Sequence, residues 1–160
     1  ASLSGVGEAF VLVASDTRDC KVLYANSFWT ALSGYPAHEA VGHPWAALML
    51  GRLTSAEDAN HLNSAVHSGQ AAAVALVCYK KTGVHFCNHV VAVPLGCVRS
   101  TGHPTSVVCL MMREIQAGST AAIQHHVHNQ QLQAAAAVRT QFEQRSDRSA
   151  AVPVRLSQCY

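Results

Sequence analysis

Short apolar runs separated by turn-forming residues open the chain. Residues 10–14 (FVLVA) and 21–25 (KVLYA) are apolar enough for strands, and the intervening SDTRD carries Ser and Asp, which bond to nearby backbone in turns. This pattern predicts a β-hairpin. Asn26 is then a suitable N-cap for a short helix that ends at Gly34, and residues 35–42 (YPAHEAVG) add another helical turn.

The clearest helical pattern of the chain follows at residues 54–69. Thr54 or Ser55 is placed to cap it, and Glu57 and Asp58 occupy the first turn, where the helix dipole favours negative charge. Gly69 marks its end. Apolar residues recur at helical spacing and predict one buried face, formed by Ala59, Leu62, Ala65 and Val66.

Three strand-like segments come next, at residues 72–80 (AAVALVCYK), 84–95 (VHFCNHVVAVPL) and 105–115 (TSVVCLMMREI). The segment GCVRSTGHP between the last two is rich in Gly, Pro and Ser, so we expect a hairpin loop there. Because every strand connection reads as antiparallel, the pattern predicts an α+β domain with helices on one face of an antiparallel sheet.

The composition changes after Gln116, where Ala and Gln become frequent and favour helix. We predict an N-terminal segment at 1–9, a domain at 10–116, a helix at 117–148 and an irregular tail at 149–160. The helix carries a narrow apolar stripe that Gln131 interrupts. Its members are Ile123, Val127, Ala134, Val138 and Phe142.

This stripe has to be buried, either on the sheet of the same chain or against a second chain. We expect the helix to leave the domain and the protein to form a homodimer, through the helix or through the sheet face.

Composition narrows the class of protein. The 160 residues are 49% hydrophobic and 12% charged, which is too apolar for a disordered chain. The net charge of +2, with no basic stripe, argues against nucleic-acid binding, and the longest apolar stretch is too short for a membrane span. Since the chain begins without Met, we expect it to be a piece of a longer protein.

Six cysteines are present without any CxxC pair. Most of them stand in apolar segments, so we expect free thiols packed in the core of a cytoplasmic protein. Cys78 and Cys87 flank a turn and are candidates for redox-sensing thiols, although packing in the core is the favoured interpretation. His125 and His128 share a helix face but lack a third ligand, so no metal site is expected. The sequence also holds no catalytic motif, and we do not expect an enzyme.

Two stretches of sequence carry a family resemblance. They are DTRDCKVLYANSFWTALSGYPAHEAVG and YKKTGVHFCNHVVAVP. They resemble PAS domains, and more narrowly the light-oxygen-voltage (LOV) branch and the PAS caps of ether-à-go-go type potassium channels. The resemblance covers residues 10–115 and implies a PAS fold, in which a five-stranded antiparallel sheet cups a ligand pocket under short helices, with a C-terminal helix in addition.

The resemblance also implies which residues line that pocket, and several depart from the LOV pattern. Trp45 stands where LOV domains carry the photoactive cysteine, in the segment GHPWAALMLG. Ala46 and Asn63 stand where arginines grip the flavin phosphate. Of two asparagines that hold the flavin ring, one falls at Cys78 and the other is kept as Asn88. The glutamine of the last strand falls at Met112, or at Met111 under a different gap.

These departures argue against both cofactors of the family. A flavin phosphate is dianionic and needs charge-assisted donors, which the replaced arginines no longer supply. Haem-binding PAS domains ligate iron from a histidine on the long helix, and His61 does not fall on that position. We therefore expect neither flavin nor haem, and the identity of any other ligand stays open.

Two functions from different classes remain. The first is a sensory or regulatory PAS domain of a larger signalling protein, without LOV photochemistry, that relays the binding of a ligand or partner to the C-terminal helix. Its partners would be the flanking domains of the same protein and a second copy. The alternative is a ligand-free protein–protein interaction module, similar to the channel caps, whose pocket is filled by side chains.

Overall fold

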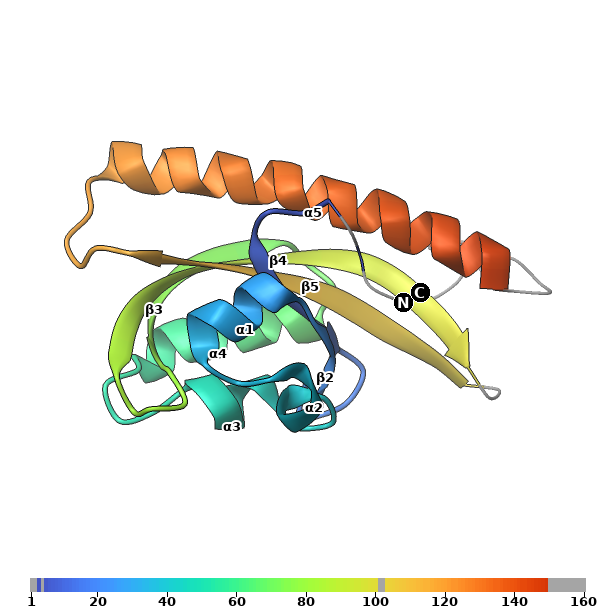
Figure 1. Ribbon diagram of the computed structural model, residues 1–160, viewed down its shortest axis with the longest axis horizontal. Helices are drawn as coiled ribbons and strands as arrows, with labels where there is room; N and C mark the ends of the chain where they lie inside the picture. The colour runs from blue at the N-terminus through green and yellow to red at the C-terminus, as the bar shows by residue number, and fades with distance from the viewer. Residues whose placement is uncertain (1–2, 4, 101–102, 150–160) are drawn as a thin grey trace.

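The computed structural model describes residue 3, residues 5–100 and residues 103–149. Five strands and five helices are formed within this part of the chain (Figure 1). The strands are β1 (Ala9–Ala14), β2 (Val22–Ala25), β3 (Ala72–Tyr79), β4 (His85–Ser100) and β5 (His103–Ile115). The helices are α1 (Ser27–Ser33), α2 (Ala37–Ala40), α3 (Trp45–Met49), α4 (Ala56–His67) and α5 (Ala121–Ser149).

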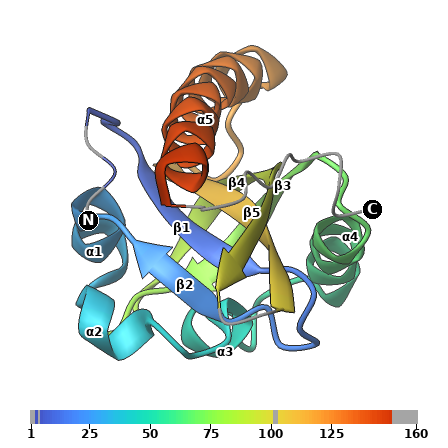
Figure 2. The same ribbon diagram turned by 90° about the vertical axis from the view of Figure 1, so that its right-hand side faces the viewer.

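The strands form one antiparallel sheet in the order β2-β1-β5-β4-β3. Helices α1 to α4 cover one face, which we call the inner face, and α5 runs along the opposite, outer face (Figures 1 and 2). The predicted α+β fold is therefore confirmed. None of the helices in the described ranges is both long and apolar enough to cross a membrane.

Local capping works as the sequence indicates. The Asn26 side chain accepts a hydrogen bond from Trp29 N at 2.9 Å and another from Phe10 N at 3.0 Å, so it joins α1 to β1. Ser55 is the N-cap of α4, and the four apolar residues predicted for the buried face of this helix are all buried. The caps and the buried face depend only on residues that are close in sequence, so the local pattern is enough to predict them.

The sheet separates two apolar clusters. On the inner face, alternate residues of β1 and β5 pack with the side chains of α1, α3 and α4. On the outer face, the intervening residues of the same strands pack with α5. Every residue of β1 is buried as a result, which is typical of a strand covered on both sides.

The predicted hairpin loop at residues 96–104 is wrong in its extent. Strand β4 continues to Ser100 and β5 starts at His103, with Cys97 paired to Ser106 and Val98 to Thr105. A β-bulge lies between Pro94 and Gly96, and Gly96 adopts a φ of 116° there. The Pro and Gly that suggested a loop therefore belong to a bulge within the strand. Cross-strand pairing thus overrides the local signal.

Helix α5 begins at Ala121, four residues later than expected, and the tail predicted at 149–160 lies almost wholly outside the described residues. The expectation that this helix leaves the domain is wrong. Helix α5 folds back and packs mainly on β4 and β5 (Figure 2). The reason is that the outer sheet face is apolar and needs a cover.

Candidate functional site

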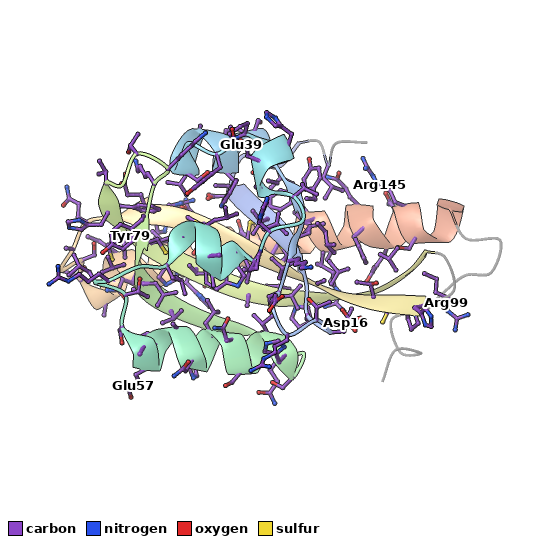
Figure 3. All side chains as sticks on the ribbon, turned by 90° about the horizontal axis from the view of Figure 1, so that it is seen from below. Asp16, Glu39, Glu57, Tyr79, Arg99 and Arg145 are labelled. Carbon is purple, nitrogen blue, oxygen red and sulfur yellow. The ribbon has the colours of Figure 1, made fainter. Side chains whose placement is uncertain are left out.

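The space between the inner face and the short helices is packed with large side chains. Trp45 is 0% exposed, and it shares one cluster with Trp29 of α1, Met49 of α3 and Leu62 of α4. Helix α3 is held in place by its backbone, since Trp45 N donates to Cys20 O at 3.3 Å. Figure 3 shows the side chains crowding this space, while Glu39 and Glu57 lie at the edge of the molecule.

Cys78 and Asn88 face the tryptophans from neighbouring strands. Both are fully buried, and Asn88 Nδ2 donates to Cys78 Sγ at 3.6 Å. Three buried polar atoms in this cluster have no hydrogen-bond partner among the described residues, namely Trp29 Nε1, Trp45 Nε1 and Asn88 Oδ1. Each such atom costs about 1–3 kcal/mol when left unsatisfied.

The structure brings together four of the six pocket residues that the resemblance implies. Trp45, Cys78, Asn88 and Met112 belong to or adjoin the inner cluster, whereas Asn63 is only half-buried on α4. Met111 points to the outer face, because adjacent residues of a strand face opposite sides. Of the two methionines, Met112 is therefore the one at the inner site.

This inner site does not fit a flavin. A ligand pocket needs roughly 300 Å³ or more, and here fully buried indole and thioether groups take that space. Ala46 and Asn63 also offer no cation to a phosphate. A surface groove of about 660 Å³ does run between the N-terminal segment and α1, but it is lined by other residues, including Val6, Tyr24 and Phe28.

The histidines give no sign of a haem or metal site. His61 and His125 are exposed, and no group of three or more His, Cys, Asp or Glu residues suited to a metal occurs in the described ranges. The nearest approach to a nucleophile and base is Cys20 Sγ, which lies 3.6 Å from His67 Nε2. Burial, followed by the charges of Asp19 and Asp16, raises the pKa of Cys20, so this thiol is poorly suited to nucleophilic chemistry.

Cys78 and Cys87 do not form a redox pair. Cys78 is paired with Phe86 and Cys87 with Val77, so the two sulfurs lie on opposite faces of the sheet. Cys20, Cys78, Cys87 and Cys109 are free thiols.

A second candidate site lies on the outer face, where α5 meets β4. Gln131 is 0% exposed, and its Nε2 donates to the backbone oxygen of His89 at 2.8 Å. Its Oε1 lies 2.6 Å from His89 Nδ1, so this ring nitrogen carries the hydrogen and donates it. Gln131, the polar residue that interrupts the apolar stripe, thus hydrogen-bonds α5 to β4.

Sequence reasoning missed this contact. His89 and Gln131 are 42 residues apart, and neither belongs to a recognisable motif. The surrounding contact is apolar, with Val127, Ala135, Val138 and Phe142 buried on the same face of α5. Ile123, predicted to belong to the stripe, is 52% exposed, and Ala135 takes the buried place that was expected for Ala134.

Comparison with known proteins agrees with this architecture. A sequence profile described as a PAS domain matches residues 7–116. The chain belongs to the PAS domain family. Among curated PAS-containing relatives, phototropin-2 of Oryza sativa subsp. japonica is 29% identical over 94 residues, which are 59% of this chain and 10% of that protein. The chain therefore spans about a tenth of this relative.

Solved PAS structures share the fold at low identity. A light-oxygen-voltage domain studied with a flavin analogue has a TM-score of 0.62 at 20% identity, covering 77% of this chain and 88% of its own. The PAS domain of the fruit-fly ELK potassium channel has a TM-score of 0.58 at 17% identity, covering 71% and 90%. Solved structures with a similar fold thus include a LOV domain and a channel PAS domain, the two groups named in the sequence analysis.

The environment of the thiols of this PAS domain predicts an order of reactivity. Burial raises the pKa of Cys78 to about 11, and it raises the pKa of Cys109 far above its usual range. At pH 8 a thiol with a pKa of 11 is only about 0.1% ionised, so alkylation is slow. Because Cys87 is half-buried, we expect iodoacetamide to modify it well before Cys78 or Cys109.

Peptide mass mapping over time measures this order, and the denatured protein, in which the three thiols should react alike, is the control. Modification of Cys78 in the folded protein at the rate of Cys87 would show that the inner cluster is open to solvent.

Proposed function

We propose that this PAS domain is a regulatory module that works without flavin photochemistry and whose output element is α5. PAS and LOV domains form a family of sensory modules, and they are typically not enzymes. The observation that carries the finer proposal is the docking of α5 on the outer sheet face through the buried pair Gln131 and His89.

The geometry of β4 supports a connection between the two faces. Asn88 points into the inner cluster and carries an unsatisfied oxygen, while the next residue, His89, points outward and holds Gln131. A shift of this strand that satisfies Asn88 necessarily moves His89. Binding at the inner side and the position of α5 are therefore coupled by one peptide unit.

The contact of α5 is suited to reversible docking. Its buried stripe contains one Ala and one Gln besides three larger apolar residues, so its apolar contribution is modest. At the N-terminal side, Arg113 of β5 adds polar contacts, because it pairs with Glu8 and donates to Gln130 Oε1 at 2.5 Å.

The alternative is a ligand-free interaction module, and the packed inner cluster favours it. Trp45 and Met49 fill the volume that a ligand would occupy, and a channel PAS domain is among the structural neighbours. The three unsatisfied polar atoms favour the ligand-binding form instead, because a small polar molecule that accepts from Trp45 and donates to Asn88 would satisfy two of them.

The cofactor content of the purified protein separates these forms. We expect a colourless protein without a flavin absorption band, whose mass under native conditions equals that of one or two polypeptides with no added small molecule. The Trp45→Cys variant restores a thiol at the LOV position, and it should remain colourless because no arginine is restored for the phosphate. A yellow wild-type protein would contradict the proposal, and a retained colourless molecule would favour the ligand-binding form.

Removal of the Gln131 side chain tests the output element. The Gln131→Ala change leaves His89 Nδ1 and the His89 backbone oxygen without partners, and each loss costs about 1–3 kcal/mol of docking free energy. Amide hydrogen exchange in α5 should accelerate accordingly, while exchange in β5 stays unchanged. The Gln133→Ala change, at an exposed position of the same helix, is the matched control and should alter docking by less than about 0.5 kcal/mol.

Two results would contradict the role of this pair. The first is unchanged protection of α5 in Gln131→Ala, and the second is equal loss of protection in both variants.

Assembly with a second copy stays a prediction, as do flanking domains as partners and a cytoplasmic location. Since α5 covers the sheet of its own chain, a dimer would have to use the exposed side of α5 around Leu132 or another surface. Light scattering on the whole chain and on a chain ending at Gln116 should show a dimer for at least one of them. Two monomers at high concentration would show that the homodimer prediction is wrong.

A further inference from the structure

We propose that the contact between α5 and the sheet is a proton-sensitive latch, in which protonation of His128, whose ring faces the buried His89, releases the helix. The inference rests on the proposed function, since it assigns a signal to the docking of α5. It concerns a pair of side chains that belongs to neither the inner cluster nor any cofactor site.

The two rings meet edge to face across the contact. Their centroids lie 6.1 Å apart at an interplanar angle of 83°. His89 is buried on β4, and His128 is half-buried on α5, one turn before Gln131. Because His89 already donates from Nδ1 to Gln131, the only position left for a second proton is Nε2.

Protonation of His128 is unfavourable while the helix is docked. A cation on this ring would be partly withdrawn from water, and the ring lies against the buried His89 with 6.1 Å between the two centroids. The pKa of His128 is lowered from its usual 6.5, first because the ring is partly withdrawn from water and then because His89 and His125 lie nearby. The facing geometry of the two rings and the lowered pKa of His128 thus both disfavour protonation while α5 is docked.

The other charged groups around the pair do not remove this penalty. Arg113 is the cross-strand neighbour of His89 on β5, and its positive charge is shared with Glu8. On β3, the neighbour is the uncharged Ala75. Cys87 stands two residues before His89, and burial raises its pKa, so it is neutral between pH 5.5 and 7.5. On α5, the nearby titratable group is His125, another potential cation.

The direction of the pH effect follows from the lowered pKa. A released helix binds the proton at an ordinary pKa near 6.5, whereas the docked helix binds it only at lower pH. Docking is therefore fully stable above pH 6.5 and weakens as the pH falls through this value. One histidine with a lowered pKa makes the opening constant larger at pH 5.5 than at pH 7.5, by at most about tenfold.

Amide hydrogen exchange of the whole chain at pH 7.5 and 5.5, corrected for the intrinsic exchange rate, measures this constant. In the wild-type protein, the α5 amides should open more at pH 5.5 than at pH 7.5, by up to about tenfold, and those of β5 should not change. The His128→Gln variant should bring the ratio of the two opening constants close to one. The His126→Gln change removes an exposed histidine of the same helix and should keep the wild-type ratio.

A second variant guards against local unfolding. The His89→Asn change removes the titratable ring and leaves an amide that can still donate toward Gln131, so it should also reduce the ratio. The latch is overturned if the wild-type helix opens equally at both pH values. It is equally overturned if His128→Gln and His89→Asn keep the ratio of His126→Gln. An α5 that lacks protection already at pH 7.5 would instead refute the proposed function.

Discussion

The need to cover both faces of one sheet governs this structure. Strand β1 is buried along its whole length, and β5 is buried from Val107 to Met112. Both faces of these strands are therefore shielded from solvent. The short helices cover the inner face, and α5 covers the outer one. Without α5, the side chains of Phe10, Val91, Leu95 and Met111 would form an exposed apolar patch of a size that isolated domains avoid.

This constraint explains why a helix with a modest apolar stripe stays on its own domain. The outer face supplies most of the apolar surface, and α5 needs only Val127, Val138 and Phe142 as larger contacts. The buried Gln131 would be costly on any unmatched surface, because both ends of its amide need partners. His89 supplies both, so the pair selects one position of the helix on the sheet.

The sequence predicted those parts of the fold that depend on near neighbours. Asn26 and Ser55 cap their helices, and the buried face of α4 follows from its spacing. The five-stranded antiparallel sheet came with the family resemblance, whereas the order of its strands was not predicted. The position of α5 was missed, although a signal existed. The nearly unbroken apolar runs of β1 and β5 are typical of strands buried on both faces, and such strands call for a second cover.

The inner site was predicted in part, and the outer one was not. Trp45, Cys78, Asn88 and Met112 were predicted to share one site because the resemblance aligned them with pocket positions of the family, and the structure places them on the inner side. Gln131 was read as an interruption of an apolar stripe, because pattern alone cannot show that a partner 42 residues away satisfies an amide. Long-range polar pairs of this kind depend on three-dimensional placement, which short spacings do not encode.

Under the proposed function, the inner cluster is filled and α5 is the element that moves. The measurement that tests this account most directly is the distance between two probes, one on an exposed residue of α5 and one on the β3 edge of the sheet. Unnatural amino acids should carry the probes, so that the free thiols stay untouched. The account predicts one narrow distribution of short distances that persists when labelled protein is diluted with unlabelled protein. A broad distribution, or one that lengthens on dilution, would contradict it, because the helix would then be undocked or supplied by a second chain.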